Sequence, residues 1–354
     1  MPLRQWHRAP RGDQVARMSG FDRYQRQALF APLGAAGQAR LGAARVAIVG
    51  AGALGTHLVN LLARGGVGFL RVIDRDVVEW TNLHRQVMFD ESDAREGRPK
   101  AEAAAAAVAR FNAEVAVEPR VADLSPRNAA ELLAGVDLIL DGTDNVETRY
   151  LINDFAVKTG VPWIYGGAVG STAVACAFAP GGPCLRCLWD DPPPPGSLPT
   201  CDTAGVLPSA PALAASLQAA WAMRALAGDA IEPWLVQIDV WDGQTARVRV
   251  RKRDDCKTCV RGAYEFADAK ATSWTTNLCG RGAVQVSPPE AAPLDLAALA
   301  SRFAPLGEVR RKGLYLEFDV EGHTLMVFAD SRVIVKNTTD PIRARTLVAR
   351  YLGL

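Results

Sequence analysis

The stretch RVAIVGAGALGTHLVNLLARGGVGFLRVID, residues 45–74, decides the fold of this chain. It opens with a short β-branched apolar run and passes into GAGALG at residues 50–55. A helical pattern follows, and then a second apolar run, residues 69–73, closes on Asp74. Strand, glycine turn, helix and strand in this order form the first half of a doubly wound α/β sheet. We therefore predict a Rossmann-like α/β fold with a doubly wound, mostly parallel sheet.

The same alternation continues after this stretch and is typical of parallel α/β architecture. An Ala-rich helix and an alternating strand come first, and two more helix–strand pairs complete the series. The predicted elements are a helix at 100–111, a strand at 115–121, a helix at 126–133, a strand at 137–141, a helix at 150–159 and a strand at 162–165.

The second half of the chain changes character. Four consecutive prolines at 192–195 form a stiff segment that fits neither a helix nor a sheet interior, which predicts an exposed loop. From about residue 284, shorter helix and strand patterns predict a small α+β domain. We divide the chain into a disordered basic tail (1–20), a nucleotide-binding domain with a metal site (21–262), a linker (263–283) and the α+β domain (284–354).

Composition and charge limit the partners. The chain has 354 residues, of which 49% are hydrophobic and 22% charged, as in ordinary globular proteins. The formal net charge of +2 is too small to favour nucleic acid or an acidic membrane as the main partner. No apolar run approaches the roughly 20 residues that span a bilayer. We expect neither a membrane nor a nucleic acid to be its main partner.

The N-terminus and the cysteines indicate the cellular location of the protein. Residues 1–20 carry four arginines without a following apolar core, which argues against a secretory signal, and a translation start at Met18 stays open. The seven cysteines are an odd number, and four of them form two Cys-x-x-Cys pairs, which is no secreted disulfide framework. We predict a cytoplasmic protein.

The glycine turn predicts a nucleotide site. Gly50, Gly52 and Gly55 let the backbone approach a phosphate, and the helix that follows offers unpaired N–H donors at its N-terminus. Asp74 ends the next strand, where it can accept hydrogen bonds from ribose hydroxyls. Two alternatives stay open at this point: a tight turn without a ligand, and a nicotinamide or flavin oxidoreductase.

The residues after Asp74 favour a triphosphate over a dinucleotide. A triphosphate that loses pyrophosphate accumulates charge, which cationic side chains must neutralise in the transition state. Arg85 and Lys100 suit that task, although each taken singly is as readily a solvated charge. Asp144 follows a strand at the sheet edge, where it could hold Mg²⁺ between phosphates. Further polar candidates in the same segment are Asp76, Asn82 and Gln86.

The two Cys-x-x-Cys pairs predict a structural zinc site. Four thiolates give Zn²⁺ a closed tetrahedral site without an open position, and the metal would join two distant chain segments. Redox or disulfide use is the alternative. The predicted ligands are Cys184, Cys187, Cys256 and Cys259.

The other cysteines are different. Cys201 stands alone after the proline-rich loop, where a nucleophilic thiol that visits a bound acyl group could be placed, or where an ordinary small residue could lie. Cys176 lies in an apolar strand pattern and is expected in the core. Cys279 has no partner that the sequence identifies.

The order of these motifs resembles the ubiquitin-activating-enzyme superfamily. Specifically, residues 21–262 are similar to bacterial adenylyltransferases that serve the thiamine and molybdopterin sulfur carriers, with the thiamine branch the most similar. One departure is His84, where glutamine is more usual. The motifs are RYQRQ (23–27), the glycine loop, DRD (74–76), NLHRQ (82–86), RPK (98–100) and DN (144–145).

The resemblance implies roles for these residues. Asp74 would bind the ribose, Asp144 would hold Mg²⁺, and Arg26 would reach the nucleotide of a neighbouring subunit, which implies a homodimer. Cys201 would link to the carrier during sulfur transfer. The residues implied to contact the nucleotide and its phosphates are Asp76, Asn82, Arg85, Gln86, Lys100 and Asn145.

The predicted function is ATP-dependent adenylation of the C-terminal Gly-Gly carboxylate of a small ubiquitin-like sulfur carrier. Pyrophosphate leaves, and sulfur from a donor such as a cysteine desulfurase then forms a thiocarboxylate for thiamine or molybdopterin synthesis. A related adenylating enzyme that acts on tRNA, of the threonylcarbamoyl-adenosine dehydratase type, is the alternative. Two further alternatives are a nicotinamide oxidoreductase and a non-catalytic scaffold that zinc holds together and whose ATP site is decayed.

Overall fold

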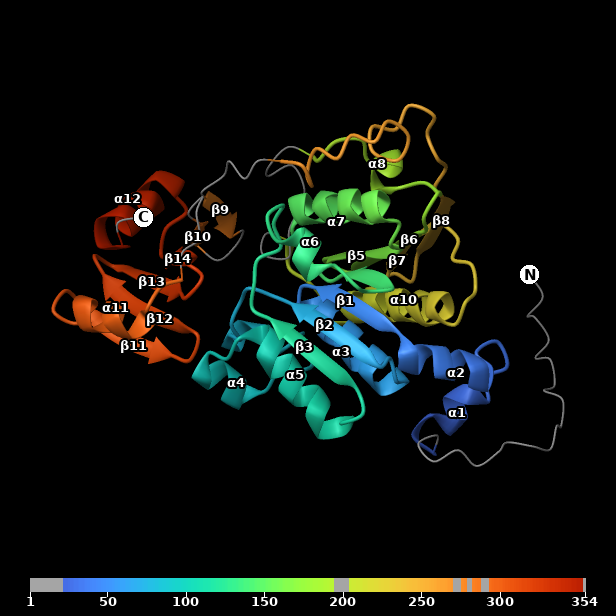
Figure 1. Cartoon of the computed structure of the whole chain (residues 1–354), viewed down its shortest axis with the longest axis horizontal. Coiled ribbons are helices and arrows are strands. Elements are labelled where there is room, and N and C mark those ends of the chain that lie inside the picture. Colours follow the sequence, from blue (N-terminus) through green and yellow to red (C-terminus); the bar gives the residue numbers. More distant parts are fainter. Residues whose placement is uncertain (1–21, 194–203, 270–274, 279–281, 288–292, 353–354) are drawn as a thin grey trace.

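The computed structural model describes residues 22–193, 204–269, 275–278, 282–287 and 293–352. Two sheets organise this part of the chain (Figure 1). The larger sheet has eight strands, in the order β3 (Ala116–Arg120), β2 (Phe69–Ile73), β1 (Arg45–Val49), β4 (Leu138–Asp141), β5 (Trp163–Val169), β6 (Thr172–Phe178), β7 (Trp234–Asp239) and β8 (Thr245–Arg249). Strands β1 to β5 pair in parallel, and β6 to β8 extend the sheet in antiparallel fashion.

Helices cover both faces of this sheet. Alternate residues of the central strands enter two separate cores, as the period of two in a strand requires. Val46 and Ile48 pack toward α3, α5 and α10, whereas Ala47 and Val49 pack toward α6 and α7 (Figure 1). The bounds of these helices are α3 (Ala53–Gly65), α5 (Lys100–Phe111), α6 (Ala129–Leu132), α7 (Val146–Thr159) and α10 (Ser209–Leu226).

Shorter elements complete the large domain. They lie at the N-terminus, between β2 and α5, and after β6. These elements are η1 (Asp22–Tyr24), α1 (Gln25–Ala28), α2 (Gly34–Ala43), η2 (Trp80–Asn82), α4 (Glu91–Glu96) and α8 (Leu185–Leu188).

The smaller sheet is antiparallel and belongs to the C-terminal domain. Helices α11 (Leu296–Phe303) and α12 (Pro341–Leu352) cover one of its faces. The other face packs against Val77 of the large domain. Its strands lie in the order β11 (Glu308–Lys312), β12 (Tyr315–Val320), β13 (His323–Phe328), β14 (Val333–Lys336), β10 (Ala283–Val286) and β9 (Thr275–Leu278).

The strand order creates a crevice. Strand β1 has β2 on one side and β4 on the other, so the chain leaves the carboxyl end of β1 in one direction and that of β4 in the other. Ligands of doubly wound sheets bind at such a switch point. The loops after β1, β2 and β4 therefore define the candidate site.

The predicted fold class is confirmed: a doubly wound, parallel-dominated sheet with a small C-terminal antiparallel sheet. Helix α2 and strand β11 were not expected, and β9 lies within the predicted linker 263–283. Within the described part of the chain, no helix is both long enough and apolar enough to cross a bilayer.

Candidate functional site

The glycine loop joins β1 to α3 at the crevice. A Cβ on Gly55 would lie 1.8 Å from the carbonyl oxygen of Gly50, so packing within the protein requires this glycine. A Cβ on Gly52 would meet nothing closer than Nε2 of Gln86, at 4.0 Å. Gly52 is also the N-cap of α3, and no side chain caps this helix. The loop thus presents free N–H donors beside open space, which suits an anionic group.

Asp74 ties the end of β2 to this loop. Its Oδ2 accepts the N–H of Ala51 at 2.6 Å, and its Oδ1 accepts the N–H of Asp76 at 2.7 Å. Burial raises the pKa of Asp74, and the ammonium group of Lys100 opposes that shift. Lys100 is itself buried at the first position of α5, with its Nζ 3.4 Å from Oδ2 of Asp76. Two carboxylates and one ammonium group are therefore gathered beside the glycine loop.

The NLHRQ motif forms η2 and the turn after it. Asn82 is buried, and its Oδ1 accepts the N–H of Glu79 at 3.0 Å, so its side chain fixes the turn. Gln86 is buried beside Gly52, and its Oε1 has no hydrogen bond among the described residues. Arg85 is half-buried and donates to the carbonyl of Thr81 at 2.7 Å. An unsatisfied buried amide oxygen carries a free-energy cost that a ligand can remove.

The loop after β4 closes the other side of the crevice. Asp144 is exposed there, and its negative charge contributes to the raised pKa of Arg149. Asn145 is the N-cap of α7, because its Oδ1 accepts the N–H of Thr148 at 3.2 Å. The structure thus gives Asn145 a role in capping that the sequence did not indicate.

Sequence reasoning missed a buried ion pair that supports this loop. Arg149 donates to Oδ2 of Asp141 at 3.0 Å, to the carbonyl of Thr143 at 2.7 Å and to that of Gly166 at 3.1 Å. Burial lowers the pKa of Arg149, but the Asp141 carboxylate outweighs burial and leaves it raised. The available signal was an aspartate at the end of the apolar run LILD, followed by an arginine in the next helix.

Arg26 lies far from this crevice in its own chain. It is exposed on α1, and the neighbouring Gln27 donates to the carbonyl of Gly65 at 2.8 Å, at the C-terminal end of α3. The glycine loop lies at the other end of this 13-residue helix, which is about 20 Å long. Figure 1 shows α1 on the opposite side of the large sheet from the C-terminal domain.

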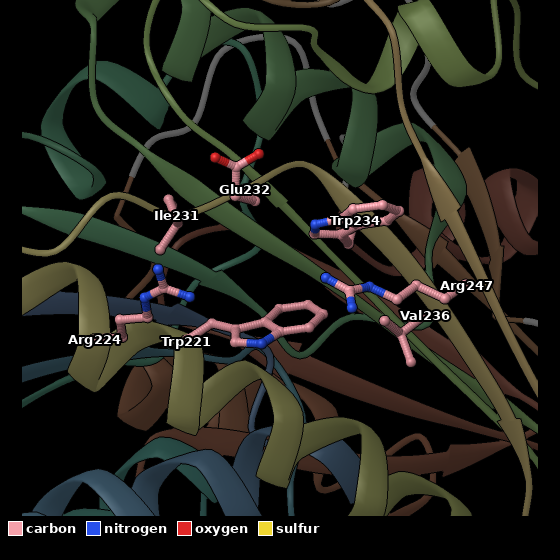
Figure 2. A pocket seen from close by; sticks show the side chains of 7 residues that line it. All are labelled: Trp221, Arg224, Ile231, Glu232, Trp234, Val236 and Arg247. Carbon is pink, nitrogen blue, oxygen red and sulfur yellow. The ribbon is translucent and has the colours of Figure 1, made fainter. Parts of the chain in front are cut away.

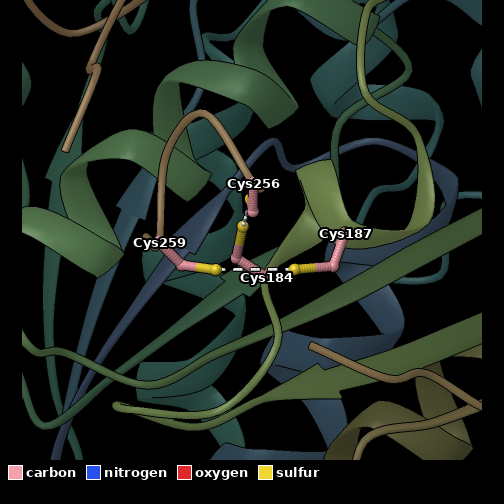
Figure 3. Close-up of side chains that lie close together, drawn as sticks. All are labelled: Cys184, Cys187, Cys256 and Cys259. Carbon is pink, nitrogen blue, oxygen red and sulfur yellow. Dashed lines mark hydrogen bonds between the residues drawn. The ribbon is translucent and has the colours of Figure 1, made fainter. Parts of the chain in front are cut away.

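The four predicted cysteine ligands meet in one cluster (Figure 3). Their Sγ atoms all lie within 4.8 Å of one another, with Cys184 and Cys256 at 3.6 Å and Cys187 and Cys259 at 3.4 Å. Thiolates at tetrahedral positions around one zinc ion are about 3.8 Å apart. The cluster could therefore hold one metal ion.

Helix α7 fixes both halves of the cluster. Asn153 Oδ1 accepts the N–H of Leu185 at 2.8 Å, and Asp154 accepts the hydroxyl of Thr258 at 3.2 Å. Arg186, between the first two cysteines, is fully buried and donates to Glu265, to Asp191 and to the carbonyl of Asp190. Sequence reasoning gave Arg186 no role.

Two candidate cysteines lie outside the described residues. These are Cys201 and Cys279. Cys176 is fully buried in β6, as expected for a core residue, and burial raises the pKa of its thiol to about 12.

A hollow of about 300 Å³ lies elsewhere, between α10 and strands β7 and β8 (Figure 2). Trp221 and Trp234 line it, and the guanidinium of Arg247 lies 3.8 Å from the ring centre of Trp234. None of the residues predicted to contact a nucleotide lines this hollow. The crevice at the glycine loop remains the candidate nucleotide site.

Comparison with known proteins shows which proteins this chain resembles. The ThiF family model matches residues 24–258. The chain is 38% identical over 335 residues to the sulfur carrier protein ThiS adenylyltransferase of Bacillus subtilis (strain 168), covering 94% of this chain and 99% of that protein. It is 41% identical over 246 residues to the SAMP-activating enzyme E1 of Haloferax volcanii, covering 69% of this chain and 90% of that protein.

A solved structure supports the fold. The crystal structure of E. coli MccB with MccA-N7isoASN superposes with a TM-score of 0.60 at 23% identity, covering 69% of this chain and 75% of that one. At this identity the likeness concerns the fold alone. The match to the Bacillus protein, in contrast, also includes most of the C-terminal domain, because it covers 94% of the chain.

Proposed function

This chain belongs to the ThiF family, and we propose that its crevice between β1 and β4 holds the ATP. The chain is an adenylyltransferase that uses ATP to activate a sulfur carrier protein. One observation carries the placement of the nucleotide: open space at Gly52 lies at the uncapped N-terminus of α3 and beside buried Gln86, whose Oε1 has no hydrogen bond among the described residues. A bound nucleotide would supply partners to both.

We assign the polar residues of the crevice as follows. Asp74 accepts hydrogen bonds from the ribose, because a carboxylate at the end of β2 is where doubly wound folds bind it. Lys100 and Arg85 neutralise the phosphates. Asp76 orients Lys100 through their contact at 3.4 Å. The remaining proposed nucleotide contacts are the glycine loop, Asn82, Gln86 and Asn145.

The chemistry needs positioning more than proton transfer. The C-terminal carboxylate of a carrier is ionised at neutral pH, so no general base is required. The chain brings this carboxylate into line with the α-phosphate and stabilises the charge of the leaving pyrophosphate with Lys100 and Arg85. Fixed charges that need no reorganisation supply most of the rate in such sites.

Magnesium has a suitable place in this arrangement. Asp144 offers exposed carboxylate oxygens at the mouth of the crevice, and Mg²⁺ prefers oxygen ligands. We propose that Asp144 holds the ion, which supplies charge neutralisation to the phosphates when bound.

We propose that the ion of the four-cysteine cluster is zinc. Four thiolates in a closed arrangement suit Zn²⁺ and leave no position for a substrate, so the role is structural. The ion would connect α8 to the turn after β8, which are 72 residues apart in the chain at Cys184 and Cys256.

We also propose a homodimer in which Arg26 contacts the partner's nucleotide. This proposal is supported by the position of α1 beside the C-terminal end of α3, about 20 Å from the glycine loop at the other end of that helix. Leu29 and Phe30, just after α1, are 66% and 64% exposed. Apolar side chains of this size on the surface are typical of interfaces.

The pathway and the sulfur step are proposals of the same kind. The similarity to a ThiS adenylyltransferase supports a carrier of thiamine synthesis with a Gly-Gly C-terminus, and a molybdopterin carrier is the second candidate. We propose a cysteine desulfurase as sulfur donor and Cys201 as the residue that links to the carrier. We further propose a cytoplasmic location, where ATP and reduced thiols are present, and the domain division at 262 and 284.

ATP–pyrophosphate exchange tests the function. The purified protein is incubated with labelled pyrophosphate, ATP and one candidate carrier at a time, with and without Mg²⁺. We expect exchange that needs both Mg²⁺ and one carrier, and that is lost when the Gly-Gly terminus of this carrier is removed. Tight ATP binding without exchange for any carrier would overturn the proposal.

A further inference from the structure

The segment after β2, residues 74–79, contacts the nucleotide crevice and the C-terminal sheet at once. Val77 forms a β-bridge with Pro99, and Glu79 has extended backbone angles. Successive side chains of an extended chain point in opposite directions. Asp74 and Asp76 contact the glycine loop and Lys100, whereas Val77 and Glu79 contact the C-terminal domain.

The contacts with the C-terminal domain are both apolar and polar. Val77 packs in an apolar cluster with Met326 and Ile334. Lys336 donates to Glu79 at 3.1 Å. Tyr315 donates to the carbonyl of Gly97 at 3.3 Å. The C-terminal sheet therefore packs directly on the backbone that carries the proposed ATP ligands.

Arg332 is the most unusual of these contacts. It follows β13 at the turn into β14, is 3% exposed, and stacks on Phe328 with 3.8 Å between the guanidinium carbon and the ring centre. Its Nη1 donates to the carbonyl of Arg75 at 2.9 Å. Its Nη2 has no hydrogen bond among the described residues. Burial lowers the pKa of Arg332 in spite of the nearby Asp330.

A buried and incompletely bonded guanidinium destabilises a fold, so a role outside folding would account for its presence. The position of its one backbone bond indicates that role. The carbonyl of Arg75 and the N–H of Asp76 belong to the same peptide unit, which is planar and rigid. Arg332 holds the oxygen of this unit, and the Asp74 carboxylate holds its N–H at 2.7 Å. Arg332 thereby fixes the peptide that orients Asp74.

We propose that Arg332 is a positioning residue for ATP, through which the C-terminal domain holds the Asp74–Asp76 turn in its binding-competent form. The inference rests on the proposed assignment of Asp74 and Lys100 to ATP. Without Arg332 the turn populates other conformations, and the apparent dissociation constant rises by the inverse of the competent fraction. The chemical step and the binding of the carrier are unaffected, because Arg332 touches neither.

The test compares two arginines of the same domain. Arg332→Met keeps the length and the packing on Phe328 but removes the bond to Arg75. Arg302→Met is the matched control, because Arg302 also donates to a backbone carbonyl, that of Tyr351, and also lies against a phenylalanine ring, but on the outer side of the domain. Arg332→Lys, which keeps a donor, should retain part of the ATP affinity that Arg332→Met loses.

The measurements are ATP–pyrophosphate exchange over a range of ATP and carrier concentrations, direct ATP binding, and thermal unfolding. We expect Arg332→Met to raise KM and Kd for ATP about tenfold, with kcat, the carrier KM and Tm unchanged or Tm raised. Equal ATP affinity in Arg332→Met and Arg302→Met would overturn the proposal. So would a loss of kcat in parallel with Tm, which indicates a structural role.

Asp74→Ala separates this inference from the assignment on which it rests. A loss of ATP binding in Asp74→Ala with no change in Arg332→Met means that the site is right and the positioning role is wrong. Full ATP affinity in Asp74→Ala means that the site itself is misassigned.

Discussion

The proposed nucleotide crevice and the four-cysteine cluster differ in whether their polar groups have partners within the protein. The crevice has an uncapped helix N-terminus and an unsatisfied buried oxygen on Gln86. The cluster has four sulfur atoms that all lie within 4.8 Å of one another. An open set of donors suits a ligand that binds and leaves, and a closed set suits an ion that stays. This difference agrees with the roles proposed for them, catalytic for the crevice and structural for the cluster.

Lys100→Met tests the proposed role of the crevice, and of the substitutions described here it should have the largest effect. The exchange rate should fall about a hundredfold to a thousandfold, because a buried ammonium group that stabilises phosphate charge is lost. Lys158→Met is the control, since Lys158 pairs with Asp268 at the surface. Exchange assays on both variants measure the effect. A loss below tenfold in Lys100→Met would contradict the proposed role.

Cys256→Ala removes one of the four sulfur atoms of the cysteine cluster. We expect the proposed zinc ion to be lost and the free energy of unfolding to fall by about 3 kcal/mol, with KM for ATP unchanged in the protein that remains folded. Metal analysis and denaturant unfolding measure both. Cys176→Ala, which removes a buried thiol outside the cluster, should keep the metal. Retention of a full zinc content in Cys256→Ala would contradict a four-thiolate site.

Asn145 combines a structural role with a proposed role in binding, because it caps α7 and is also a proposed nucleotide contact. Asn145→Ala should lower the free energy of unfolding by about 1 kcal/mol through loss of the α7 cap. Asn145→Asp keeps a good cap, so stability should be retained, while a carboxylate near phosphates should weaken ATP binding about fivefold. Unfolding curves and ATP titrations distinguish the two roles. Unchanged ATP affinity in both variants would limit Asn145 to capping.

Glu321 accepts several hydrogen bonds at the surface of the C-terminal domain. Its substitution should have the smallest effect of those described here. Hydrogen bonds from Tyr351 and Arg350 lower the pKa of Glu321 from 4.5 to about 2. The stabilisation is therefore complete above pH 4.5 and is lost as the pH falls toward about 2. Glu321→Gln should flatten the stability profile in this window and leave it unchanged near neutrality. An equally steep acid profile in the variant would contradict this assignment.

Much of the fold follows from local sequence pattern. Strand β2 and helix α5 have the bounds that periodicity predicts. Strand β11 escaped prediction because its sequence EVRRK lacks apolar alternation, as an edge strand with one partner permits. Helix α2 escaped because its Ala- and Gly-rich sequence has no clear apolar face.

The grouping of the candidate site residues was predictable where it depends on short motifs. The glycine loop, Asp74, Asp76 and Lys100 come together because parallel strands end at one edge. Arg149, Arg186 and Arg332 were not predictable in the same way. Their roles depend on backbone carbonyls and carboxylates that only tertiary structure brings within reach, and an arginine in a sequence is most often a solvated charge.

The two-sided use of residues 74–79 restricts how this protein can change in length. Asp76 and Val78 face the large domain and Val77 and Glu79 face the C-terminal domain, so an insertion or deletion of one residue here would exchange the two sets and turn Val77 toward Lys100. Replacements at single positions leave the alternation intact. Homologues that carry the same C-terminal domain should therefore accept substitutions in this segment but no gaps. Designers who graft the domain onto a shorter relative must match this register before they optimise any contact.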